Sequence, residues 1–75
     1  MPQTADVVMA ACRRIAGQCG GYVTLPQVQA DENVGRVIRI PERVIDVMSV
    51  LAGERKVRMT ARHPVPTWAV TEEEA

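Results

Sequence analysis

Basic side chains gather in the middle of this 75-residue chain, although its formal net charge is zero. Residues 36–62 hold seven basic side chains against three acidic ones, which leaves a local excess of four positive charges. The seven are Arg36, Arg39, Arg43, Arg55, Lys56, Arg58 and Arg62. Grouped cations of this kind can bind phosphate groups, so the pattern indicates a nucleic acid as the first partner to consider.

The side chains that could perform catalysis are few. The chain shows no nucleophile with a base at a suitable spacing, no glycine-rich phosphate loop and no paired carboxylates on a defined scaffold, so we expect no enzyme. His63 is the single histidine, and no cysteine or carboxylate stands at metal-ligand spacing around it. We therefore expect neither a metal nor another cofactor.

The two cysteines favour a reducing compartment. Cys12 and Cys19 are seven residues apart on a predicted helix, about 10 Å along its axis. This is too far for a disulfide, so buried free thiols are expected. Asp6, Arg13 and Arg14 interrupt any apolar run near the start, and no other run is long enough to cross a membrane. A cytoplasmic location without a membrane partner follows as a prediction.

Two helices are predicted from the spacing of apolar residues. The first begins with Thr4 as its cap, ends at Gly20, and leaves Arg13 and Arg14 in solvent. Its apolar stripe comprises Val8, Ala11, Cys12, Ile15, Ala16 and Cys19. Another helix runs over residues 41–52, starts at Pro41, and buries Val44, Val47, Met48 and Leu51.

The remaining segments are shorter. Residues 22–25 read as one strand of a small sheet, and residues 25–32 as a short helix with Leu25 and Val28 facing inward. Residues 34–40 fit either a strand or an irregular linker. The last part of the chain reads as a hairpin that turns inward Val57, Met59, Ala61, Trp68 and Val70 and turns outward Lys56, Arg58, Thr60 and Arg62. Residues 72–75, with Glu72, Glu73 and Glu74, are expected to be a frayed acidic tail.

This order of elements resembles the winged helix-turn-helix family of DNA-binding domains. Three motifs carry the resemblance: GGYVTLPQV as first strand and second helix, VIDVMSVLAGERKVRM as recognition helix and first wing strand, and TWAVTEEE as the return strand. It covers residues 4–71. The resemblance implies a single α+β domain over residues 1–75, a small winged helix-turn-helix domain with three helices and a C-terminal two-stranded β-hairpin wing.

The resemblance also implies where double-stranded DNA would bind. The helix over residues 41–52 would enter the major groove, with Arg43, Asp46 and Ser49 toward bases or phosphates. The basic wing over residues 55–63 would lie on the DNA backbone. Its contacts would be Lys56, Arg58, Arg62 and His63, and the basic middle adds Arg36 and Arg39. The expected function is that of a small transcriptional regulator or repressor that acts as a homodimer.

Two other interpretations remain open from the sequence. The stretch GRVIRIPERVIDVMSVLAGERKV is similar to the swapped-hairpin DNA-binding domains of antitoxins and transition-state regulators, which form intertwined dimers and have a Gly-Arg strand. Winged-helix folds also serve as protein-interaction modules within larger complexes, because a fold does not fix a function. The acids Glu42 and Asp46 on the reading helix and the zero net charge favour a protein partner.

Overall fold

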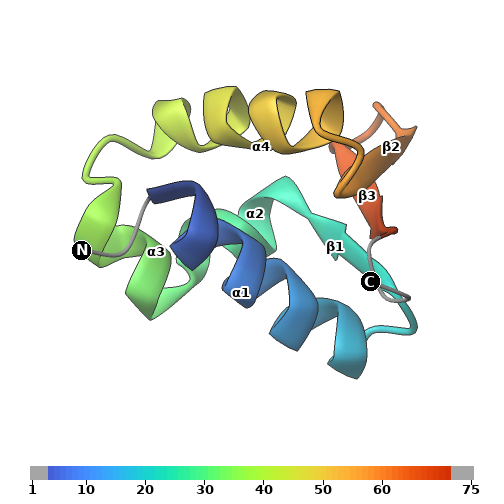
Figure 1. The fold of residues 1–75 in the computed structure, drawn as a ribbon, viewed down its shortest axis with the longest axis horizontal. Coiled ribbons are helices and arrows are strands. Elements are labelled where there is room, and N and C mark those ends of the chain that lie inside the picture. The colour runs from blue at the N-terminus through green and yellow to red at the C-terminus, as the bar shows by residue number, and fades with distance from the viewer. Residues whose placement is uncertain (1–3, 72–75) are drawn as a thin grey trace.

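The computed structural model describes residues 4–71, which form a small α+β domain with helices on one side and a sheet on the other (Figure 1). The expected acidic tail lies outside the described residues. In chain order the elements are α1 (Thr4–Gln18), β1 (Tyr22–Thr24), α2 (Leu25–Ala30), α3 (Glu32–Val37), the 3-10 helix η1 (Pro41–Arg43), α4 (Val44–Gly53), β2 (Val57–Ala61) and β3 (Thr67–Val70). The described residues thus contain four α-helices, where three were expected.

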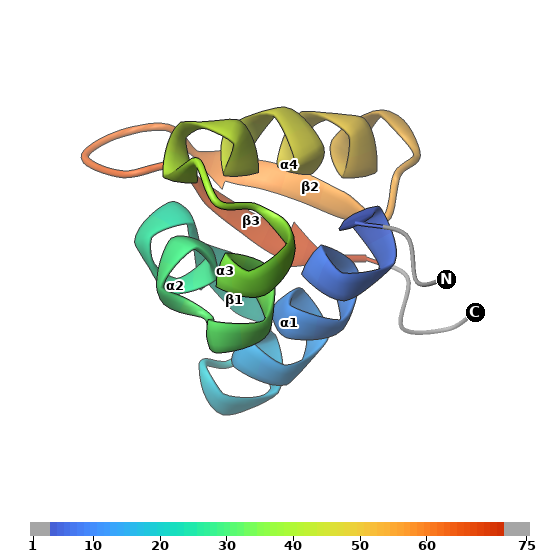
Figure 2. The same cartoon turned by 90° about the vertical axis from the view of Figure 1, so that its left-hand side faces the viewer.

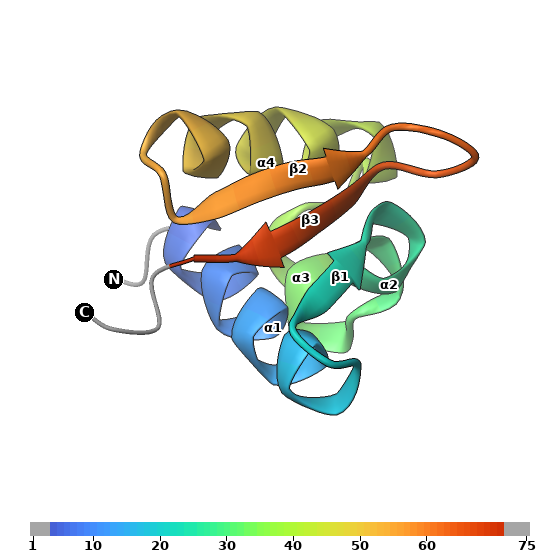
Figure 3. The same cartoon turned by 90° about the vertical axis from the view of Figure 1, so that its right-hand side faces the viewer.

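The sheet is antiparallel, with the strand order β1-β3-β2. Tyr22 pairs with Ala69 in one direction, and Arg58 pairs with Ala69 in the other. The C-terminal hairpin is therefore joined by β1 and does not form a two-stranded wing alone. One face of the sheet packs on the helices, and Figure 3 shows its other face open toward the viewer. Trp68, which pairs with Val23 and Met59, is buried on the helix side.

The helix α1 ends earlier than its apolar stripe suggested. Gly20 and Gly21 both take a positive φ, at 73° and 98°, and the N–H of Gly21 donates to the carbonyl of Ala16 at 2.7 Å. This left-handed turn releases Cys19 from the helix, and Cys19 is exposed while Cys12 is buried. The expectation of two buried thiols is therefore wrong for Cys19.

Residues 34–40 form no strand, and only their last three residues form the irregular linker that was the other expectation. Val34 to Val37 belong to α3, and only the residues from Ile38 to Ile40 link this helix to η1. Asp31 caps the helix, because its carboxylate accepts a hydrogen bond from the N–H of Val34 at 3.1 Å. Val34 is also fully buried. The cap and this burial together outweigh the preference of the β-branched residues Val34 and Val37 for a strand.

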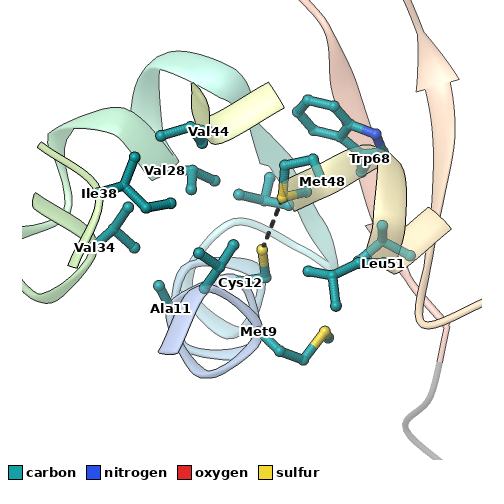
Figure 4. Close-up of a cluster of buried hydrophobic side chains, with 13 residues drawn as sticks. Met9, Ala11, Cys12, Val28, Val34, Ile38, Val44, Met48, Leu51 and Trp68 are labelled. Carbon is teal, nitrogen blue, oxygen red and sulfur yellow. Dashed lines mark hydrogen bonds between the residues drawn. The ribbon is translucent and has the colours of Figure 1, made fainter. Parts of the chain in front are cut away.

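The hydrophobic core lies between the four α-helices and the sheet (Figure 4). The stripe predicted for α4 is confirmed: Val44, Met48 and Leu51 are buried, and Val47 packs partly against them. Met48 meets α1 through its sulfur atom, which lies 3.7 Å from the Sγ atom of Cys12. Burial, and to a smaller extent the nearby carboxylate of Asp31, raise the pKa of the Cys12 thiol to about 11, so this thiol is un-ionised near neutral pH.

None of the helices in the described part of the chain is both long and apolar enough to cross a lipid bilayer.

Candidate nucleic-acid interface

The helix α4 presents a mixed surface to solvent. The residues expected to read DNA, Arg43, Asp46 and Ser49, are all exposed, although Arg43 belongs to η1 and not to α4 itself. The hydroxyl of Ser49 donates to the carbonyl of Ile45 at 2.9 Å. Its proton is therefore already engaged, and its oxygen is left as an acceptor for a ligand.

The hairpin exposes the expected basic residues. Arg58 on β2 is exposed, as are Arg62 and His63 in the loop that follows. The pairing shifts between Met59 and Ala61, where β2 has one residue more than β3. Such a bulge breaks the strict alternation of side chains. Ala61 was expected to face inward and is instead exposed.

The helix and the hairpin loop belong to one face of the molecule. In Figures 1, 2 and 3, which share a vertical axis, α4 forms the upper surface and the loop between β2 and β3 reaches the same level. The helices α1, α2 and α3 lie below. A ligand lying across this upper surface would therefore meet α4 and the loop together.

Three of the predicted basic residues are less available or lie elsewhere. Arg36 is on α3, which Figure 1 places at the opposite end of the molecule from the hairpin, and its guanidinium lies 3.4 Å from the carboxylate of Glu32. Lys56 is half-buried, with its amine 3.5 Å from the carboxylate of Glu54. Arg39 is exposed in the link before η1. The structure thus brings the expected residues of the hairpin together but does not bring Arg36 to them.

Within the part of the chain that the structure describes, most exposed arginines have no acidic partner. Within residues 4–71, no carboxylate lies within ion-pair distance of five guanidinium groups. These belong to Arg39, Arg43, Arg55, Arg58 and Arg62. A cation that is solvated in the free protein can pair with a phosphate without first breaking an internal salt bridge.

One of these five, Arg55, lies at the start of the predicted wing over residues 55–63 but was not named among its contacts. It follows α4 with a φ of 65°, in the left-handed region. Its own N–H donates to Ala52 and the next N–H, of Lys56, donates to Leu51, both at 3.0 Å, so the two bonds close the helix end as a Schellman motif. Glycine is favoured at this position, and a residue with a Cβ costs about 1 kcal/mol there. The nearest glycine, Gly53, stands two residues before this position and cannot relieve the cost. An arginine where glycine is expected after a helix is the feature of the sequence that could have marked Arg55 as a candidate contact.

The described residues offer no grouping of three or more His, Cys, Asp or Glu side chains that could hold a metal ion. The chain matches no family model, no curated protein and no solved structure.

Proposed function

We propose that this protein binds double-stranded DNA in the manner of a winged helix-turn-helix domain, with α4 in the major groove and the hairpin on the adjacent backbone. The observation that carries the proposal is that α4 and the hairpin loop share one exposed face (Figures 1 and 3). A helix that enters a groove next to a hairpin that follows the backbone needs this arrangement. The ten residues of α4 span about 15 Å, a length that suits the major groove.

The two elements of this face carry different chemical groups and would make different kinds of DNA contact. The arginines of the hairpin, Arg58 and Arg62, would supply phosphate contacts that are independent of sequence. On α4, the carboxylate of Asp46 and the hydroxyl oxygen of Ser49 are acceptors, and a carboxylate can accept a hydrogen bond from the amino group of cytosine. We therefore propose that affinity comes mainly from the hairpin and base preference mainly from α4.

The proposed biological role is that of a small transcriptional regulator that acts as a homodimer. A two-fold dimer would present two copies of α4 to half-sites about 34 Å apart along the duplex. The swapped-hairpin alternative receives no support from the middle of the chain, because Gly35 and Arg36 lie in α3 where that family has a strand.

A protein-interaction module is the second candidate, and the apolar residues on α4 favour it. Ile45 is 36% exposed and Val50 54% exposed on the solvent side of the helix, beside Glu42 and Asp46. Acids repel phosphate, and exposed apolar side chains gain from burial against a protein. In this alternative α4 docks on a protein partner, and binding would change little with salt.

The two candidates separate in a binding titration with labelled duplex DNA, followed by fluorescence anisotropy at 50 and 200 mM salt. Each phosphate contact lowers affinity by about 3.5-fold over this interval, because bound counterions are released. Arg58→Ala combined with Arg62→Ala should weaken binding to all duplexes alike and reduce the logarithmic salt slope by about 1.8. Ser49→Ala should leave the slope unchanged and alter the preferred sequence.

A matched control is Arg13→Gln, which removes one positive charge from the exposed side of α1. It should reduce affinity only slightly, because α1 lies below the proposed contact face (Figure 2). If the unmodified protein fails to bind duplex DNA even at 50 mM salt, the DNA proposal is wrong and the protein-interaction module takes its place.

A further inference from the structure

A hollow of about 410 Å³ opens where α4 turns into β2. Figure 3 shows this turn beside the end of β3. The residues that line the hollow are Ala52, Arg55, Val57, Arg58 and Thr71. Two of the five are arginines, and none is acidic.

The backbone on one side of the hollow is held in place by Thr71. The N–H of Thr71 donates to the carbonyl of Lys56 at 3.0 Å, and its hydroxyl donates to the carbonyl of Arg55 at 2.7 Å. The N–H groups of Arg55 and Lys56 are in turn held by the last carbonyls of α4. Four hydrogen bonds therefore fix the point from which the side chain of Arg55 begins, and a fixed origin reduces the entropy lost when a ligand binds.

The two guanidinium groups at the hollow have no acidic partner within residues 4–71. The nearest acid in the sequence, Glu54, has its carboxylate 3.5 Å from the amine of Lys56. Arg58 pairs across the sheet with Ala69, whose methyl group has no oxygen that could accept a hydrogen bond from the guanidinium. The hollow therefore combines a rigid backbone with two cations that no carboxylate of residues 4–71 neutralises, and this combination suits an oxyanion.

The backbone conformation of Arg55 is a second observation. A positive φ at a helix end favours glycine, yet this position carries a long cationic side chain. Backbone strain that persists at a residue is grounds for a functional hypothesis. Substitution by glycine should stabilise the fold, so a requirement for the guanidinium would explain why arginine stands there.

We infer that the hollow between Arg55 and Arg58 binds an oxyanion, and that its ligand is a backbone phosphate of the bound DNA. The inference rests on the proposed function and adds Arg55 to its contacts. Arg58 lies on β2 and Arg62 in the loop that follows, and four residues of extended chain span about 13 Å, so we assign the two arginines to different phosphate groups. The hollow would therefore bind one phosphate and the hairpin loop another.

The test uses the intact chain labelled with ¹⁵N and titrated with inorganic pyrophosphate at low salt. We expect saturable shifts at the backbone N–H groups of Arg55, Lys56 and Thr71 and at the side-chain Nε–H groups of Arg55 and Arg58. Arg55→Gln, which keeps the backbone strain and removes the charge, should abolish them, whereas Arg13→Gln should leave them in place. Shifts that are absent, or that gather elsewhere on the protein, would overturn the inference whether or not DNA binds.

The DNA titration supplies the second arm. Arg55→Gln should reduce the logarithmic salt slope by about 0.9 and weaken binding at 200 mM salt several-fold. Arg55→Gly should weaken binding equally while it raises Tm by about 4 °C, because glycine relieves the strain. A higher Tm with unchanged DNA binding would show that Arg55 only ends the helix, and would overturn the inference.

The source of the oxyanion is distinguished by neutralising the acids that follow Thr71 in the sequence. Pyrophosphate could shift the N–H signals of the hollow only after Glu72, Glu73 and Glu74 are all replaced by glutamine. In that case the chain's own carboxylates are the ligand, and the phosphate assignment is wrong. If pyrophosphate shifts the N–H signals of the hollow in the unmodified protein but duplex DNA does not bind, the oxyanion site is supported, and the DNA-binding proposal fails together with the assignment of the ligand to DNA.

Discussion

The carboxylate of Asp31 performs two tasks whose energies can be separated. It caps α3 by accepting from the N–H of Val34 at 3.1 Å, and it forms an ion pair with Arg14 on α1. Asp31→Ala removes both interactions. A lost helix cap costs about 1 kcal/mol, and an ion pair whose arginine is 46% exposed contributes about 0.5 kcal/mol after allowance for solvent screening. The free energy of unfolding should therefore fall by about 1.5 kcal/mol.

Asp31→Asn distinguishes the cap from the ion pair. Asparagine caps a helix about as well as aspartate, so this variant should lose only the contribution of about 0.5 kcal/mol from Arg14. In a domain of this size, the expected loss of Tm is about 2 to 4 °C for Asp31→Asn and about 6 to 12 °C for Asp31→Ala. The combination of Asp31→Asn with Arg14→Gln should be no less stable than Asp31→Asn alone, because the pair is already broken.

The assay is urea unfolding followed by the fluorescence of Trp68, which is 1% exposed in the fold and is the single tryptophan of the chain. The midpoint and slope together give the free energy of unfolding. If Asp31→Asn is as destabilising as Asp31→Ala, the ion pair outweighs the cap and the reasoning is refuted. A change below about 0.3 kcal/mol for Asp31→Ala would show that neither interaction stabilises the fold.

The same residue predicts a dependence on pH. Burial alone would raise the pKa of Asp31, but hydrogen bonds from the N–H of Val34 and from Arg14 outweigh it and lower the pKa below its ordinary value of 3.8. The folded state therefore favours the carboxylate. Its stabilisation is complete above pH 3.8 and is lost as the pH falls through the lowered folded value. The stability difference between the unmodified protein and Asp31→Asn should shrink over that acid range.

Two further predictions concern the core. At pH 8 the exposed thiol of Cys19 should react quickly with a disulfide reagent. Cys12 is buried and has a pKa raised to about 11, so it should react only as the protein unfolds. Equal rates for the two thiols would contradict the burial of Cys12. Met48→Ala should destabilise the fold by about 2 to 5 kcal/mol in urea unfolding, because Met48 is 0% exposed. Val50 lies on the solvent side of the same helix and is 54% exposed, so Val50→Ala should change the free energy of unfolding by less than about 0.5 kcal/mol. A similar loss for Met48→Ala and Val50→Ala would refute the assigned orientation of α4.

The elements with regular spacing were predictable from the sequence. The recurrence of Val8 and Cys12 in α1, and of Met48 and Leu51 in α4, indicates helices because residues at this spacing share one helix face. The hairpin follows from alternation and from its prolines. These patterns are local, so the helices and the hairpin can be predicted from them without knowledge of the rest of the fold.

Three features were not predictable in the same way. The helix α3 begins at a cap whose aspartate also pairs with Arg14 from another helix, while the valines of α3 favour a strand when read alone. Cys19 continues the spacing of α1, yet the turn at Gly20 removes it from the core. The left-handed backbone of Arg55 depends on how α4 ends against β2, and so does the hollow that Arg55 lines.

An amphipathic helix on each side of the centre of the chain, a basic C-terminal hairpin and a middle rich in arginine can all be inferred from the order of the residues. Periodicity and composition encode these properties within a few residues. The pairing of Tyr22 with Ala69, by which β1 joins the hairpin, became visible only in the folded chain. The same holds for the face that α4 and the hairpin loop share, from which Arg36 is absent. Contacts between residues so distant in sequence depend on how the whole core packs, because each element can bury its apolar side in more than one arrangement.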